Sequence, residues 1–102
     1  MDRETALTIL RAHESELRAA GVEHLSLFGS VARGDNRADS DVDVSVCLTE
    51  EAARGGFAYF GRLDALRHTL TRFLGRPVDV VVQPVRQDPL RHAIETEGAS
   101  AF

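Results

Sequence analysis

The sequence predicts an α/β protein in which helices pack against a small β-sheet. Two observations support this fold class. Short runs rich in valine and leucine, typical of strands, alternate with longer segments whose apolar residues recur at helical spacing. Glycine or proline stands at most of the borders between these segments. The 102 residues have the length of one domain, so we expect a single domain over residues 1–102.

The N-terminal segment, residues 2–20, is expected to form the first helix. Its leucines recur at helical spacing, and Gly21 provides a stop signal. The leucines concerned are Leu7, Leu10 and Leu17. The run HLSLF at residues 24–28 alternates apolar and polar side chains and therefore predicts the first strand.

A turn and a second strand follow. The Gly-Ser pair at residues 29–30 interrupts the first strand, and residues 31–33 predict one short helical turn. Residues 35–40 are polar and predict a loop. The run VDVSVCL at residues 42–48 predicts a strand whose valines fall on one face and whose Asp43 falls on the other.

The C-terminal half predicts a long helix, a third strand and a last helix. The long helix is expected over residues 57–74 and ends at Gly75. The valine-rich run at residues 78–83 predicts the third strand, and an Asp-Pro pair starts a last helix over residues 88–98. The side chains of the long helix that are expected in the core are Phe57, Tyr59, Phe60, Leu63, Leu70 and Phe73.

Composition and charge exclude several classes of protein. The net charge of −4 argues against nucleic acid as a partner, because phosphate contacts require a basic surface. All twelve basic residues are arginine, which excludes lysine Schiff-base chemistry and a Walker-type phosphate loop. No apolar run could cross a membrane and the first residues do not resemble a secretory signal, so no membrane association is expected. The single cysteine, Cys47, fits a reducing compartment, and we expect a cytoplasmic protein.

A candidate phosphate site lies where the first strand ends. Gly29 permits close approach of a ligand to the backbone, and the amide groups at the start of the helical turn favour an anion. Ser30 adds a hydroxyl donor, and Arg33 lies one turn further on, within reach of the same phosphate oxygens. A Gly-Ser pair alone is usually only a turn, so this signal depends on the acidic residues that follow.

Three aspartates form a candidate metal site. Asp41 and Asp43 are two residues apart at the start of the second strand, so their side chains share a face with Cα atoms about 6.6 Å apart. Asp79 interrupts the apolar third strand and would lie beside Asp43 if the two strands are neighbours. Three clustered carboxylates repel one another unless a cation is present, and oxygen ligands of this kind suit Mg²⁺.

These residues also carry a family resemblance. The run LFGSVARGD at residues 27–35, followed by SDVD at residues 40–43, resembles the G-S-x-x-R-G and S-D-x-D signature of the minimal nucleotidyltransferase (MNT) family. That family belongs to the DNA polymerase β superfamily. The run GRPVDV at residues 75–80 resembles the family's strand with the third carboxylate. The resemblance is specific and implies a nucleotidyltransferase fold, with a small mixed β-sheet flanked by about four helices.

The resemblance implies a role for each candidate residue. The residues implied to bind the nucleotide are Gly29, Ser30, Arg33 and Ser40. Asp41, Asp43 and Asp79 would hold a two-ion Mg²⁺ site, and Asp79 would help to deprotonate the attacking hydroxyl. The implied reaction is in-line attack on the α-phosphate of ATP, which transfers AMP and releases pyrophosphate.

The resemblance also implies a partner. MNT proteins pair with HEPN-domain proteins in toxin–antitoxin modules, so we expect an antitoxin that AMPylates its HEPN toxin within a hetero-oligomer. An alternative is an antidote that neutralises its partner by binding alone, although a pure binder has no physical need for three clustered acids. A third option is an antibiotic-modifying adenylyltransferase, which normally requires an added acceptor-binding domain. We expect no room for one in 102 residues.

Overall fold

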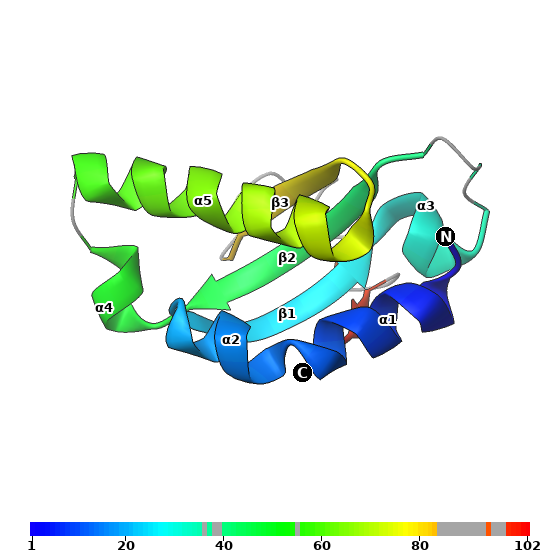
Figure 1. Ribbon diagram of the computed structural model, residues 1–102, viewed down its shortest axis with the longest axis horizontal. Helices are drawn as coiled ribbons and strands as arrows, with labels where there is room; N and C mark the ends of the chain where they lie inside the picture. The colour runs from blue at the N-terminus through cyan, green and yellow to red at the C-terminus, as the bar shows by residue number, and fades with distance from the viewer. Residues whose placement is uncertain (36, 38–39, 55, 84–93, 95–97) are drawn as a thin grey trace.

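A computed structural model gives the architecture of the chain (Figure 1). It describes residues 1–35, 37, 40–54, 56–83, 94 and 98–102, apart from the side chain of Phe57. The strands are β1 (Val22–Phe28), β2 (Val42–Leu48), β3 (Val78–Val82) and β4 (Ala99–Ser100). The helices are α1 (Arg3–Ala12), α2 (Glu14–Ala19), α3 (Gly29–Arg33), α4 (Glu50–Ala53) and α5 (Phe57–Leu74). The α/β fold class that the sequence predicts is confirmed.

The four strands form one mixed sheet in the order β3-β2-β1-β4. Strand β1 is antiparallel to both β2 and β4, whereas β2 and β3 run parallel. A parallel pair requires a crossover between its strands, and α4 and α5 supply it here. The predicted second strand is confirmed at both ends. The first strand begins two residues earlier than predicted, at Val22, with an irregular register between Val22 and His24.

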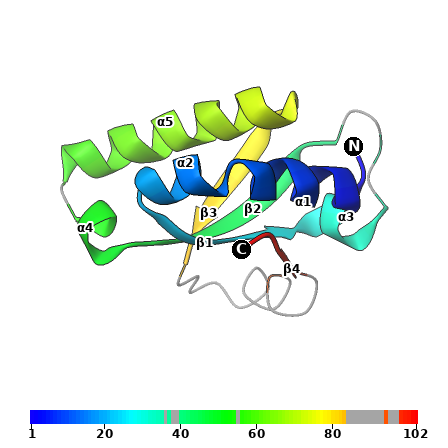
Figure 2. The same ribbon diagram turned by 60° about the horizontal axis from the view of Figure 1, so that its bottom comes forward.

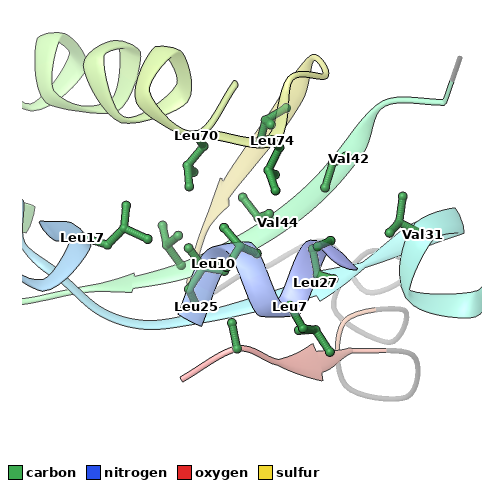
Figure 3. Close-up of a cluster of buried hydrophobic side chains, with 14 of the residues drawn as sticks. Leu7, Leu10, Leu17, Leu25, Leu27, Val31, Val42, Val44, Leu70 and Leu74 are labelled. Carbon is green, nitrogen blue, oxygen red and sulfur yellow. The ribbon is translucent and has the colours of Figure 1, made fainter. Parts of the chain in front are cut away.

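The core lies between one face of the sheet and helices α1, α2 and α5, which Figure 2 shows on the same side of the sheet. Burial of one leucine or valine side chain contributes about 1.5–3 kcal/mol to folding. Figure 3 shows part of this cluster. Side chains that are essentially inaccessible to water are Leu10, Leu17, Leu25, Leu27, Leu70, Val22, Val31, Val42, Val44 and Val46. None of the helices in the described ranges has the length and apolarity needed to span a bilayer.

The first helix is broken in two, contrary to the prediction of one helix over residues 2–20. The break falls at His13, whose backbone leaves the helical region with φ −106° and ψ 16°. The His13 ring stacks on Phe73 of α5, with the two ring centroids 3.7 Å apart. Since neither glycine nor proline marks this position, the break coincides with a tertiary contact that helical periodicity does not encode.

Helix α5 has the predicted bounds, but its buried face differs from the prediction. The side chains that it buries are Leu66, Leu70 and Leu74, while the side chain of Phe60 is 70% exposed. Phe60 stands only about 40° round the helix from buried Leu74, but it lies in the first turn of α5, whereas Leu66, Leu70 and Leu74 all lie in the second half. The prediction of Phe60 as a core residue is therefore wrong. Tyr59 is half-buried and makes an edge-to-face contact with Phe60.

Two short elements were not predicted, and one predicted element cannot be compared. Helix α4 is capped at its N-terminus by Thr49, whose hydroxyl accepts a hydrogen bond from the amide of Ala52. Strand β4 pairs with β1, and the Arg11 side chain donates to the carbonyl oxygens of Ser100 and Ala101 at 3.0 Å each. The predicted last helix over residues 88–98 lies outside the described residues, except for Ile94 and Gly98.

Candidate active site

The candidate residues meet at one edge of the sheet, where β1 ends and β2 and β3 begin. Val42 and Val44 are fully buried against the helices, so the alternation of the strand places Asp43 on the opposite face. Asp43 pairs with Asp79 in the parallel register and with Phe28 in the antiparallel register. Since neighbouring strands lie about 4.8 Å apart, the two aspartates stand side by side on this face. Strands β2 and β3 are therefore neighbours, which is the condition under which the sequence placed Asp79 beside Asp43.

Gly29 lies directly against Asp43. It follows Phe28, the residue paired with Asp43, and starts α3 with φ +74°. A Cβ atom built on Gly29 would collide with the carboxylate oxygen Oδ2 of Asp43. The positive φ and the lack of space both favour glycine at this position. The sequence identified the turn, but the collision with Asp43 follows only from the tertiary structure.

Helix α3 presents its first turn at the same edge. It spans Gly29–Arg33, and its N-terminus has no side-chain cap. Uncapped amide groups at a helix start are the groups that bind a phosphate oxygen. Ser30, in this first turn, is half-buried, and its hydroxyl can both donate and accept. The features predicted for the phosphate site therefore lie next to Asp43.

The charges at this edge act on one another. The pKa of Asp43 is raised above its ordinary value, first by burial and then by the negative charges of Asp79 and Asp41, while the positive charge of Arg33 acts in the opposite direction. Like charges raise a carboxyl pKa because they disfavour the ionised form. Asp43 is half-buried, whereas Asp41 and Asp79 are exposed. The structure thus brings the three predicted carboxylates and Arg33 into one electrostatic cluster.

Three carboxylates that repel one another supply the hard oxygen ligands that Mg²⁺ prefers. Among the residues that the structure describes, however, no three acidic, histidine or cysteine side chains stand close enough together to hold a metal ion. The donor chemistry therefore fits a divalent cation, but the side chains would have to converge on it.

Two other candidate residues have local partners. The hydroxyl oxygen of Ser40 accepts from the amide of Arg37 at 2.8 Å, which leaves its own proton available for donation. Nε of Arg33 donates to the carboxylate of Asp35 at 3.0 Å, and both side chains are largely exposed.

Asp41 lies just outside β2, between Ser40 and the first strand residue. The seven candidates thus lie on three neighbouring segments at one end of the sheet.

Sequence reasoning missed one residue at this edge. Arg76, in the turn between α5 and β3, is half-buried, and its Nη2 donates to the carbonyl oxygen of Ser40 at 3.4 Å. The sequence indicated a place for Arg76 near the site only by its position three residues before Asp79. That indication was weak because an arginine in a turn is usually solvated.

Comparisons with known proteins agree with this geometry. Residues 8–98 match the family described as the nucleotidyltransferase domain, so the chain belongs to this family and is a nucleotidyltransferase. It is 38% identical over 77 residues to the protein adenylyltransferase MntA of Thermococcus cleftensis, with 74% of this chain and 72% of the relative covered.

Two solved structures extend the comparison. A candidate minimal nucleotidyltransferase is 32% identical with a TM-score of 0.75, over 97% of this chain and 95% of the other. A second match, with a TM-score of 0.63, comes from a structure of the tri-AMPylated HEPN toxin of Shewanella oneidensis in complex with an MNT antitoxin. Its identity of 18%, over 94% of this chain and 71% of the other, supports the likeness in fold alone. The nucleotidyltransferase fold implied by the sequence resemblance is confirmed, with five helices in the described ranges where about four were expected.

Proposed function

We propose that this nucleotidyltransferase transfers AMP from ATP to a hydroxyl group of a partner protein, a HEPN toxin, and so acts as its antitoxin. The observation that carries the proposal is the pairing of Asp43 with Asp79 beside Gly29 and Ser30. The likeness to a protein adenylyltransferase supports AMP as the group and a protein as the acceptor. We further propose that residues 1–102 act as one domain, in the cytoplasm.

Each residue has a distinct part in the proposed reaction. The backbone at Gly29 and the Ser30 hydroxyl hold the triphosphate, and Arg33 and Ser40 donate hydrogen bonds to it. The carboxylates of Asp41, Asp43 and Asp79 would hold Mg²⁺, which when bound neutralises phosphate charge and lowers the barrier to displacement. Asp79 is exposed at the strand edge and accepts the proton of the incoming hydroxyl. The hydroxyl oxygen bonds to the α-phosphorus as the bond to pyrophosphate breaks.

The charge cluster favours catalysis over binding alone. The raised pKa of Asp43 means that its ionised form opposes folding at neutral pH when no cation is bound. A protein that only covers its partner would gain stability by losing one of these acids. In a nucleotide-binding enzyme, by contrast, the cation that enters with the nucleotide relieves the repulsion between the carboxylates. This argument supports an active enzyme, and the experiments below separate it from a binding-only antidote.

The first prediction concerns nucleotide binding. ATP with Mg²⁺ should raise the melting temperature of the chain, because a ligand specific for the folded state adds about 2.7 kcal/mol at a hundredfold excess over Kd. The same ATP with EDTA should produce a much smaller rise. Ser30→Ala should reduce the effect of Mg²⁺–ATP by about 1–2 kcal/mol, since one phosphate donor is lost. Differential scanning fluorimetry measures all three, and equal shifts with Mg²⁺ and EDTA would contradict the site.

The second prediction concerns the acceptor. The chain is co-expressed with the protein encoded beside it, and intact mass spectrometry of that neighbour should show one or more added AMP units. The additions should disappear with Asp41→Asn or Asp79→Asn. They should persist with Asp64→Asn, a matched change on the exposed surface of α5. An unmodified neighbour that both aspartate variants still neutralise would instead establish an antidote that acts by binding.

A further inference from the structure

The turn that joins α5 to β3 contacts the segment that carries Asp41 at two points. Before Asp41, Nη2 of Arg76 donates to the carbonyl oxygen of Ser40 at 3.4 Å. After Asp41, the amide of Val42 donates to the carbonyl oxygen of Pro77 at 2.9 Å. The two contacts come from adjacent residues of the turn and flank Asp41 on both sides. Asp41 itself lies outside the ladder of β2, so strand pairing alone does not fix it.

Arg76 is suited to this contact by its surroundings. It is half-buried, between the left-handed Gly75 that ends α5 and Pro77, whose ring restricts the backbone before β3 begins. The Ser40 carbonyl is its one hydrogen-bond partner within the described part of the chain. A guanidinium has five N–H donors, so most of those of Arg76 have no partner among the described residues.

We propose that Arg76 is a positioning residue that fixes the Ser40–Asp41 peptide and thereby orients the Asp41 carboxylate toward the cation. This inference rests on the proposed function, because it assumes that Asp41 is a ligand. Partners that orient a metal ligand typically change metal affinity by about 10–100-fold when they are removed. Two other roles are possible for this arginine, namely balancing the negative charge of the aspartates and binding the triphosphate.

The three roles predict different signs of change. If Arg76 only balances the negative charge of the aspartates, its removal would strengthen binding of a divalent metal ion, because the carboxylates would attract the ion without competition from the guanidinium. Removal of a phosphate-binding residue would weaken binding of an ATP analogue even in EDTA. Removal of a positioning residue weakens binding of the ion and leaves the analogue's affinity in EDTA unchanged. Arg76→Met makes this removal with a side chain of similar length, while Arg76→Lys retains the charge and a donor.

The experiment is a Mn²⁺ titration followed by electron paramagnetic resonance, in the presence of a saturating non-hydrolysable ATP analogue. Arg76→Met should raise the Mn²⁺ dissociation constant at least about tenfold, and Arg76→Lys should restore most of the affinity. Arg62→Met is the matched control, because Arg62 donates to the main-chain carbonyls of Ala52 and Arg54 beyond the far end of β2. It should bind Mn²⁺ as the unchanged chain does. Melting curves check that each variant is folded.

Each contrary result has a clear meaning. Tighter Mn²⁺ binding in Arg76→Met, or equal affinity, would overturn the positioning role, and so would a loss of analogue affinity in EDTA. If Arg76→Met does not fold, weak binding by the folded Arg76→Lys variant would overturn it as well. An unchanged chain that binds no Mn²⁺ would overturn both this inference and the proposed function. An unchanged chain that binds Mn²⁺ but leaves its partner unmodified would overturn the proposed acceptor alone.

Discussion

Asp43→Asn is expected to abolish AMP transfer and, at the same time, to raise the melting temperature of the metal-free protein. If Asp43 is a metal ligand, as proposed, its loss should reduce transfer at least about a thousandfold, which corresponds to about 4 kcal/mol of transition-state stabilisation. The folded protein raises the pKa of Asp43 through burial and through the charges of Asp79 and Asp41. The ionised carboxylate is therefore less stable in the folded than in the unfolded chain at neutral pH.

The sign of the stability effect can be checked against pH. A carboxyl group with a raised folded pKa favours folding at acidic pH, and that contribution is lost as the pH rises through its folded pKa. Neutral asparagine does not titrate, so Asp43→Asn should gain most over the unchanged chain above that range. The measurement is thermal melting in EDTA across a pH series, together with a transfer assay using radiolabelled ATP.

Asp64 provides the matched control for Asp43. Its pKa is lowered, chiefly by the hydrogen bond from Arg67, so ionised Asp64 favours the folded state. Asp64→Asn should therefore not raise the melting temperature and should leave transfer unchanged. Full transfer activity in Asp43→Asn would remove this residue from the proposed mechanism. A fall in its melting temperature in EDTA would contradict the electrostatic description of the site.

Gly29→Ala is expected to reduce both transfer and stability. Alanine at φ +74° costs about 1–2 kcal/mol because its Cβ crowds the neighbouring carbonyl oxygen. The same Cβ meets the carboxylate of Asp43, which must move away. Since a displacement of about 1 Å in a catalytic site can cost about a hundredfold in rate, transfer should fall by about that factor. Chemical denaturation measures the stability, and the transfer assay measures the rate.

Gly34→Ala separates the two effects. Gly34 ends the same helix, α3, with a left-handed φ of +80°, but a Cβ on it would meet no atom within 4 Å. Gly34→Ala should therefore lose a similar amount of stability and keep most of the transfer activity. If both alanine variants lose transfer to the same degree, backbone strain in α3 would explain the loss, and the contact with Asp43 would not.

The sequence by itself determined most of the local elements and singled out the candidate site residues. Strand β2 and helix α5 have the predicted bounds, because alternation and helical periodicity reflect the side of an element that faces the core. Asp43 and Asp79 stand out because a carboxylate between valines is unusual locally, whereas the Gly-Ser pair drew its significance from the acidic residues that follow it. Their separation along the chain gave no evidence of contact, so their assembly into one site remained a hypothesis.

Only the tertiary structure decided which residues lie together. The break at His13 accompanies stacking on Phe73, sixty residues away along the chain. Strand β4 exists through pairing with β1, and two residues are too few to produce a periodic pattern. The exposure of Phe60 depends on where the first turn of α5 lies relative to the core, which helical periodicity does not record.

The candidate active site shows most clearly which features the sequence determined and which the tertiary structure decided. The sequence supplied three acids and a glycine, whereas the parallel register of β2 and β3 decided that Asp43 and Asp79 are neighbours. The approach of Gly29 to Asp43 and the contact of Arg76 with Ser40 also required the folded chain. The physical reason is that periodicity records only which face of an element is buried. Contacts between distant segments depend on register and strand order, which the packing of the whole core selects.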